Sequence, residues 1–222
     1  MNVAVLFSGG KDSTFATFIA KKHGHKICCL ISLISENPDS YMFHTPSISK
    51  VRKQAEIMKI ALLTQNTKGE KETELKDLEK IIFRAKKEFN IQGIVTGTVE
   101  SAYQASRIQK ICDKLNLDCF NPLWQKDQIE LLNDLTKNNF EIIITGAFAY
   151  PLDKKWLGRK INHKFLQDVK ELYKKYKINP AGEGGEFETF VINCPLFSER
   201  LSIKERKITG KKNSWTMEIE LT

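Results

Sequence analysis

The sequence lacks several features that mark familiar protein classes. It has no CxxC pair, and its five cysteines are an odd number, which argues against a disulfide framework and a cysteine-based zinc site. Its apolar stretches are much shorter than a membrane span, and a strand-like pattern beginning at Val3 predicts no signal peptide. Repeats and low-complexity tracts are also missing. We therefore expect a cytoplasmic protein with reduced thiols and no membrane partner.

The composition is that of a soluble globular protein with surplus positive charge. Of 222 residues, 41% are hydrophobic and 28% are charged, and 35 Lys and Arg outnumber 27 Asp and Glu to give a net charge of +8. A solubilising lysine surface explains this surplus, and so does a polyanionic partner such as a nucleotide, RNA or ribonucleoprotein. Charge alone does not separate the two explanations. The length allows one large domain or two small ones.

Strand-like and helix-like stretches alternate through the first half of the chain. Short apolar runs with strand character cover residues 3–7, 26–34, 60–64, 93–98 and 117–123. Helical patterns cover residues 13–23, 48–59, 69–89 and 101–115. Ser101 and Gln104 have the spacing of a capping box for the last of these. This order predicts parallel βαβ units and therefore an α/β fold with a doubly wound parallel sheet.

The alternation loosens after Pro122, which predicts a domain boundary near residue 124. We expect a first domain over residues 1–124 and a smaller C-terminal α+β domain over residues 125–222. Asp127 and Asn162 are candidate caps for helices at 127–138 and 163–176. Residues 140–149 form a buried strand pattern, and residues 200–208 and 214–222 alternate like antiparallel strands with one polar face.

Residues 8–13, SGGKDS, lie between the first strand and the first helix. They match neither the Walker A loop nor the dinucleotide fingerprint GxGxxG. Gly9 and Gly10 nevertheless allow a sharp turn and a close approach to a ligand, and the N-terminus of the following helix favours an anion. A tight βα turn capped by Asp12 or Ser13 would use the same residues. Physics alone thus leaves a phosphate site and a plain turn as alternatives.

The segment SENPDSYMFHT follows the second strand. Loops at this edge of a doubly wound sheet bind ligands, so Tyr41 and His44 are candidate substrate-binding residues. A surface histidine without a function is the alternative for His44.

A second segment follows the fourth strand and opens a helix. Ser101, Gln104 and Arg107 recur at helical spacing, and Tyr103 lies one turn before Arg107. Arg107 could bind a phosphate or a carboxylate through two hydrogen bonds. An ordinary amphipathic helix with a surface ion pair is the alternative.

The third segment, AGEGGEFETF, crowds three carboxylates around a glycine-rich turn. Glu183, Glu186 and Glu188 repel one another unless a cation, a metal or hydrogen-bond donors lie among them. We interpret the turn as a site for a cationic substrate group, ammonium or Mg²⁺. A solvated turn is the alternative.

The strings together resemble a known family. SGGKDS after a buried strand is similar to the PP-loop of the N-type ATP pyrophosphatases. The combination of VAVLFSGGKDS, ESAYQASRIQKIC, NPLW, WLGR and NPAGEGGEFETFV…CPLF, from residue 3 to about 197, closely resembles the diphthine–ammonia ligase family of that superfamily. One departure is Pro151 in AYPLD, where the family pattern predicts a glycine.

The resemblance implies a Rossmann-like PP-loop fold, the adenine nucleotide alpha hydrolase type, and a reaction that uses ATP and Mg²⁺. In that reaction, the carboxylate of diphthine on translation elongation factor 2 is adenylated and pyrophosphate is released. Ammonia then displaces AMP to form diphthamide. Residues of the resemblance fall into four roles. The pyrophosphate is held by Ser8, Gly9, Gly10, Lys11, Asp12, Ser13 and Gly97. Catalysis uses Lys11, Asp12 and Arg107, and Asp12 is also a candidate magnesium ligand. Substrate is bound by Tyr41, His44, Tyr103, Gln104, Glu183, Glu186 and Glu188.

Elongation factor 2 and ammonium are therefore the expected partners, with no stable nucleic-acid contact. A homo-oligomer is compatible with the sequence, and the chain shows no glutaminase domain that would supply ammonia. Two rival functions stay open. One is a PP-loop enzyme that adenylates a tRNA base in the manner of a lysidine synthetase. The other is a nucleotide-binding regulator without catalysis.

Overall fold

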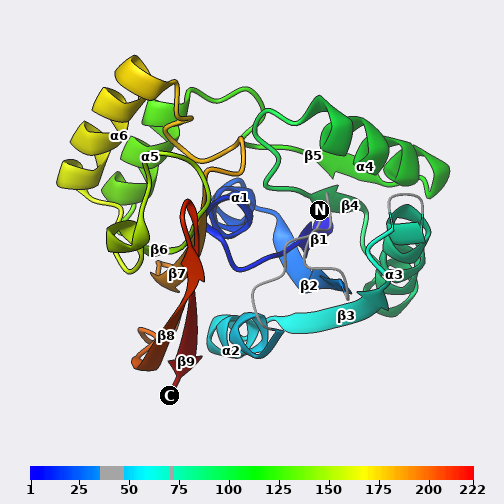
Figure 1. The fold of residues 1–222 in the computed structure, drawn as a ribbon. Coiled ribbons are helices and arrows are strands. Elements are labelled where there is room, and N and C mark those ends of the chain that lie inside the picture. The colour runs from blue at the N-terminus through cyan, green and yellow to red at the C-terminus, as the bar shows by residue number, and fades with distance from the viewer. Residues whose placement is uncertain (36–47, 71–72) are drawn as a thin grey trace. The chain divides into compact units, whose positions relative to one another are not determined.

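The computed structural model describes residues 1–35, 48–70 and 73–222. The chain divides into two units, Met1–Trp124 and Gln125–Thr222. Each unit has its own sheet: five strands in the first and four in the second (Figure 1).

The first unit is built on a parallel sheet with the strand order β3-β2-β1-β4-β5. Its strands are β1 (Asn2–Leu6), β2 (Lys26–Ser35), β3 (Ala61–Thr67), β4 (Gly93–Val95) and β5 (Asp118–Phe120). The register places Val5 of β1 beside Leu30 of β2 and Val95 of β4. The predicted doubly wound parallel sheet is confirmed.

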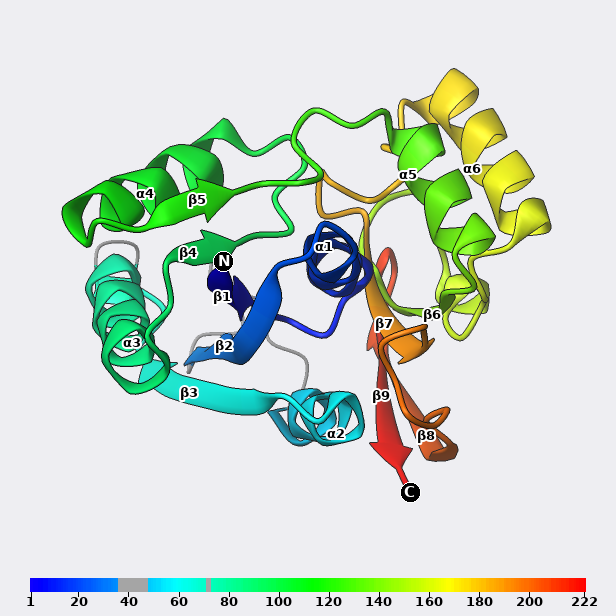
Figure 2. The same cartoon turned by 180° about the vertical axis from the view of Figure 1, so that it is seen from behind.

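Helices cover both faces of this sheet, as Figures 1 and 2 show from opposite sides. They are α1 (Lys11–Lys22), α2 (Ile48–Met58), α3 (Thr73–Phe89) and α4 (Ala102–Lys114). On one face, Ile81 of α3 and Ile108 of α4 pack against the inward side chains Ala4, Ile31 and Ile94. The other face carries α1 and α2. Successive strand side chains point to opposite faces, and burial on both sides explains why these strands are continuous apolar runs.

The second unit combines an antiparallel sheet with two helices. The strand order is β7-β6-β9-β8, formed by β6 (Glu141–Ala147), β7 (Phe187–Asn193), β8 (Ile203–Lys211) and β9 (Ser214–Leu221). Helices α5 (Gln128–Lys137) and α6 (His163–Tyr176) lie side by side, and the short 3₁₀ helix η1 covers Lys154–Trp156. This unit is the predicted smaller α+β part of the chain.

The predicted caps of three helices are present. Ser101 accepts a hydrogen bond from the backbone N–H of Gln104, Asp127 accepts from Ile129 and Glu130, and Asn162 accepts from Phe165. Such caps satisfy backbone donors that the first helical turn leaves unpaired. The helix after SGGKDS begins at Lys11, two residues before the predicted start. Strand β7 was not predicted; it forms by antiparallel pairing with β6.

The five cysteines are free, as the sequence predicted. Burial raises the pKa of the Cys29 thiol to about 12, and it does the same for Cys194. Both groups therefore stay neutral at physiological pH and act as small core residues.

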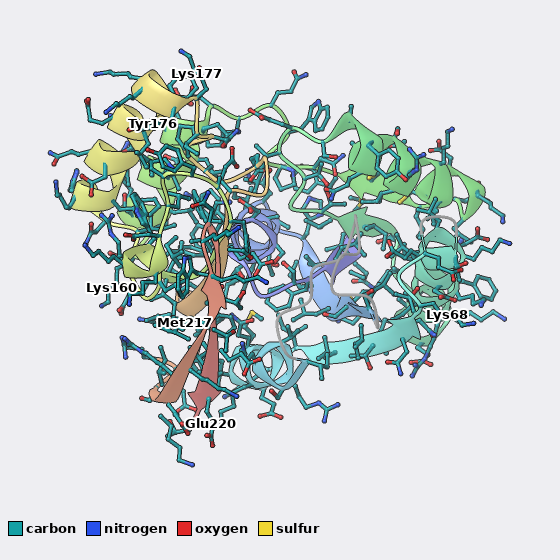
Figure 3. All side chains as sticks on the ribbon, viewed as in Figure 1. Lys68, Lys160, Tyr176, Lys177, Met217 and Glu220 are labelled. Carbon is teal, nitrogen blue, oxygen red and sulfur yellow. The ribbon has the colours of Figure 1, made fainter. Side chains whose placement is uncertain are left out.

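Exposed lysines occur on both units. Lys68, Lys160 and Lys177, which Figure 3 labels, all have exposed side chains, whereas Met217 is buried. Across residues 1–35, 48–70 and 73–222, no helix combines the length and apolar character needed to cross a membrane.

Candidate active site

The switch point of the parallel sheet lies between β1 and β4. The chain leaves β1 to one side of the sheet and reaches β4 after crossing to the other, so the loops that follow these two strands diverge at the carboxyl edge. Ligands bind at this place in doubly wound sheets. Residues 8–13 follow β1 and residues 96–98 follow β4, so these two segments lie at the expected edge of the sheet.

The SGGKDS loop turns sharply into α1. Gly9 has φ +80°, a left-handed conformation that favours glycine. Gly10 then precedes the helix in an extended conformation and provides no side-chain cap. Among the described helices, α4, α5 and α6 have polar side-chain caps, whereas α1 begins on a residue without a side chain. The positive end of the α1 dipole is suited to an anionic ligand.

Two serines close the loop on itself. The backbone N–H of Ser8 donates to Ser13 Oγ at 3.2 Å, and the two hydroxyl oxygens are also 3.2 Å apart. Gly10 N–H donates to Ser8 Oγ at 3.4 Å, which is long for a hydrogen bond. These hydroxyls are well placed to exchange partners with phosphate oxygens.

Lys11 and Asp12 form an ion pair at the start of α1. Lys11 Nζ lies 2.8 Å from Asp12 Oδ2, and the lysine side chain is only 4% exposed. The second carboxylate oxygen, Asp12 Oδ1, is buried and accepts no hydrogen bond from the described residues. A buried acceptor without a donor is costly, so this oxygen fits a cation or a donor from a ligand.

Gly97 packs directly against the beginning of α1. A Cβ atom added at Gly97 would lie 2.6 Å from the backbone nitrogen of Ser13 and 2.7 Å from the carbonyl carbon of Asp12. Only a residue without a side chain allows this approach. The structure therefore brings Gly97 together with residues 8–13.

A hydroxyl network holds the loop that contains Gly97. Thr96 Oγ1 donates to Asn121 Oδ1 at 2.5 Å and is 3.0 Å from Thr98 Oγ1, and the backbone N–H of Thr98 donates to Thr96 Oγ1. Thr96 and Thr98 are buried. Asn121, the first residue of the NPLW string, was not among the predicted site residues, because the sequence pattern placed it inside a strand that ends earlier, at Phe120.

Gln54 is a second residue that the sequence did not single out. It belongs to α2 and is fully buried, and its Nε2 donates to the carbonyl oxygen of Gly9 at 3.1 Å. In the sequence, Gln54 is one polar residue of an amphipathic helix pattern, and nothing in that pattern predicts its contact with Gly9.

Arg107 and Tyr103 form a stacked pair on α4. The Arg107 guanidinium carbon lies 3.4 Å from the centre of the Tyr103 ring, which is a cation–π contact. In the described part of the chain, Arg107 makes no ion pair that would occupy its donors. Gln104 contributes its backbone N–H to the Ser101 cap.

The acidic turn in the second unit is organised around Glu186. Its Oε1 accepts a hydrogen bond from Asn179 N–H and its Oε2 accepts one from Gly184 N–H, both at 2.9 Å. Asn179 Oδ1 in turn accepts from Ala181 N–H and Glu183 N–H. Glu188 lies on β7 opposite Gly146 of β6. The donors that relieve repulsion around Glu186 are thus backbone groups of the turn itself.

Two of the predicted substrate-binding residues, Tyr41 and His44, lie outside the described residues.

The described side chains also bear on whether the site could hold a metal ion. Across the remainder of the chain, no three His, Cys, Asp or Glu side chains gather as a metal centre. The acidic turn is therefore not a three-carboxylate metal site. A magnesium ion held by phosphate oxygens and one carboxylate is compatible with this, because Mg²⁺ keeps few protein ligands.

A doubly wound parallel sheet with an SGGKDS loop at its switch point defines an α/β protein of the PP-loop class. Comparison with known proteins identifies the family. The family model described as diphthamide synthase N-terminal domain matches residues 1–119, and the one described as diphthamide synthase C-terminal domain matches residues 127–221. The chain belongs to the diphthamide synthase family.

Curated relatives carry the name diphthine–ammonia ligase. The Rattus norvegicus protein is 34% identical over 222 residues, which cover 91% of this chain and 83% of the relative. The Homo sapiens protein is 32% identical over 94% of this chain and 85% of the relative. A solved structure titled as a predicted subunit of tRNA methyltransferase from Methanocaldococcus jannaschii covers 88% of this chain and 98% of its own, at 18% identity and a TM-score of 0.45. That likeness is too weak to bear on function.

Proposed function

We propose that this protein is an ATP-dependent diphthine–ammonia ligase that converts the diphthine carboxylate of translation elongation factor 2 into the amide of diphthamide. The observation that carries the proposal is the SGGKDS loop at the switch point, in front of a helix without a side-chain cap. Family membership supplies the substrate class, because the curated relatives are named for this reaction.

In the proposed mechanism, the loop binds the β- and γ-phosphates of ATP as the leaving pyrophosphate. The N–H groups at the start of α1, with the hydroxyls of Ser8 and Ser13, donate to the phosphate oxygens. Gly97 keeps the end of this helix accessible, since any side chain there would displace Ser13. Donors that are fixed before the reaction stabilise developing charge without reorganising.

Lys11 and Asp12 act as a pair in this account. Lys11 provides positive charge next to the departing phosphates, and Asp12 Oδ2 keeps its ammonium group in place. Asp12 Oδ1 would hold the magnesium ion that accompanies ATP, and that ion would supply further neutralisation of phosphate charge. An Asp12→Ala variant that cleaves ATP at the wild-type rate would exclude this role.

The chemistry has two balanced steps. One oxygen of the diphthine carboxylate attacks the α-phosphorus, and the bond from that phosphorus to the bridging oxygen breaks, which gives an acyl-adenylate and pyrophosphate. Ammonia then attacks the acyl carbon, loses a proton and expels AMP, which retains the carboxylate oxygen. Adenylation is needed because a carboxylate has no adequate leaving group of its own. The stacked Arg107 is suited to bind the phosphate or carboxylate during these steps.

Substrate recognition is proposed for the second unit. Glu183 and Glu188 are the carboxylates of the acidic turn that we assign to a cationic group, either the trimethylammonium of diphthine or incoming ammonium. Glu186 belongs to the same set, and its backbone contacts hold the turn in shape for the other two. The described residues contain no candidate glutaminase site, so free ammonium is the proposed nitrogen donor.

The test is to incubate the protein with ATP, ammonium and diphthine-bearing elongation factor 2, and to follow the conversion of acid to amide by mass spectrometry. Amide formation that requires all three components is the expected result. Pyrophosphate release that depends on tRNA in place of the elongation factor would support a tRNA-modifying enzyme. No ATP cleavage with either substrate would support a regulator.

A further inference from the structure

Gln54 of α2 contacts residues 8–13, which we call the phosphate loop because we propose that they bind pyrophosphate. Its side chain is 0% exposed, and its Nε2 donates to Gly9 O at 3.1 Å. The other end of the same amide also touches the loop: a Cβ atom at Gly9 would lie 2.4 Å from Gln54 Oε1. The glutamine therefore occupies the space that any side chain at position 9 would need.

The Gly9 carbonyl belongs to the peptide group that also contains the Gly10 N–H. In a trans peptide, the C=O and N–H bonds point in opposite directions. A hydrogen bond that fixes the Gly9 carbonyl toward α2 consequently directs the Gly10 N–H to the opposite side of the loop. On that side the N–H reaches Ser8 Oγ across a long 3.4 Å contact.

We infer that Gln54 is a positioning residue for pyrophosphate binding. It does not touch the ligand itself. By holding the Gly9–Gly10 peptide in one orientation, it keeps the Gly10 N–H available for a phosphate oxygen that replaces the Ser8 hydroxyl. Without this hydrogen bond, the Gly9–Gly10 peptide group could adopt other orientations, because glycine has few steric restrictions. The inference rests on the proposed use of this loop for pyrophosphate.

A change of Gln54→Leu removes the donor and keeps most of the side-chain volume. We expect the dissociation constant for inorganic pyrophosphate, measured by calorimetry on the full chain, to rise about tenfold, the size of one lost buried hydrogen bond. The dissociation constant for AMP should stay within about twofold, because AMP has no β- or γ-phosphate. The matched control is Gln128→Leu, the same change at a buried glutamine of α5 in the other unit, and it should alter neither constant.

A double-mutant cycle gives a second test that does not depend on the stability of one variant. In the wild type, Gly9→Ala adds both backbone strain and the clash with Gln54 Oε1. In a Gln54→Ala background only the backbone strain remains. The rise in the pyrophosphate dissociation constant caused by Gly9→Ala should therefore be smaller in this background than in the wild type, by about threefold or more.

Equal weakening of pyrophosphate and AMP by Gln54→Leu would overturn the inference, as would an unchanged pyrophosphate constant, additive effects in the cycle, or a wild-type protein that does not bind pyrophosphate. These measurements need no protein substrate. A protein that binds pyrophosphate as described but forms no amide would refute the proposed function and leave this inference standing.

Discussion

The two glycine-rich turns of this protein use their backbone N–H groups in opposite ways. At residues 8–13, the turn leads into helix α1, whose N-cap residue Gly10 offers no side-chain acceptor to the first helical turn. At residues 179–186, the donors of Asn179 and Gly184 bind the carboxylate of Glu186, which belongs to the same turn. Glycine content alone therefore does not distinguish a ligand site from a turn whose backbone N–H groups bind a side chain of the same turn.

The difference also separates the roles of charge in the two turns. Lys11 is buried and paired with Asp12, whose second oxygen has no donor among the described residues. Glu186 uses both of its oxygens within the turn. One carboxylate oxygen at residues 8–13 is therefore not used by the described residues, whereas both carboxylate oxygens of Glu186 bind backbone N–H groups of the acidic turn.

The largest expected effect comes from removing the buried charge of the phosphate loop. Lys11→Met should lower the rate of pyrophosphate release about 10²- to 10³-fold, because a fixed electrostatic contact to the transition state is lost. A coupled pyrophosphate assay measures this rate. Lys174→Met, at a side chain that is 73% exposed, is the control and should have the wild-type rate. A Lys11→Met rate within about threefold of the wild type would mean that the loop does not stabilise the reaction.

The second prediction compares the effect on ATP binding of a substitution at Gly97, beside the phosphate loop, with one at Gly185 in the acidic turn. Gly97→Ala places a Cβ 2.6 Å from Ser13 N, so the start of α1 must shift and the dissociation constant for ATP should rise about tenfold or more. Gly185 in the acidic turn has open space around an added Cβ, and Gly185→Asn, which tolerates its left-handed backbone, should leave ATP binding unchanged. Calorimetric titration with ATP measures both. Equal affinities in the two variants would contradict the described packing of Gly97.

Glu186→Gln tests whether the hydrogen bonds between the Glu186 carboxylate and backbone N–H groups stabilise the acidic turn. The amide places a donor against a backbone N–H, and we expect the free energy of unfolding to fall by about 1–3 kcal/mol. The KM for the protein substrate should rise as the turn loses its shape. Glu183→Gln should change that KM without a comparable loss of stability. Urea unfolding and steady-state kinetics measure the two quantities. If Glu186→Gln changed neither the rate nor the KM for ammonium and protein substrate, the turn would have no part in substrate binding.

The smallest effect concerns an ion-pair cluster in the second unit, formed by Asp168 with Arg159 and Lys164. A hydrogen bond from Lys164, with a second one from Arg159, lowers the pKa of Asp168 below its usual value of 3.8. Its stabilising contribution is complete above the unfolded pKa and is lost as the pH falls through the lower folded pKa. Between about pH 5 and about pH 2, the wild type should therefore lose more stability than Asp168→Asn. At neutral pH the two should differ by less than about 1 kcal/mol. Parallel losses on acidification would contradict the assignment.

The sequence was sufficient to predict the fold class and the position of residues 8–13 between β1 and α1. Runs buried on both faces and amphipathic helices determine a parallel sheet, and the loop after the first strand can lie only at its carboxyl edge. The family prediction was also correct, since its strings extend over most of the chain. The roles assigned to the individual site residues stay predictions.

Features that depend on contacts distant in sequence could not be predicted. Gln54 reaches Gly9 across 45 positions, and Asn121 reaches Thr96 across 25, so no local pattern announces either contact. The acidic turn shows the same limit: three nearby glutamates suggested a cation site, and their spacing did not indicate that Glu186 accepts hydrogen bonds from the backbone N–H groups of Asn179 and Gly184. Strand β7 was missed because its pairing with β6 decides its structure.

The fate of one oxygen atom tests the central claim most directly. If the carboxylate of diphthine is adenylated, a substrate whose carboxylate is labelled with ¹⁸O must transfer one labelled oxygen to AMP when ammonia displaces it. Mass spectrometry of the nucleotide products should show labelled AMP together with unlabelled pyrophosphate, in amounts equal to the amide formed. Label in inorganic phosphate with ADP as the nucleotide product, or AMP without label, would contradict adenylation of the carboxylate by this protein.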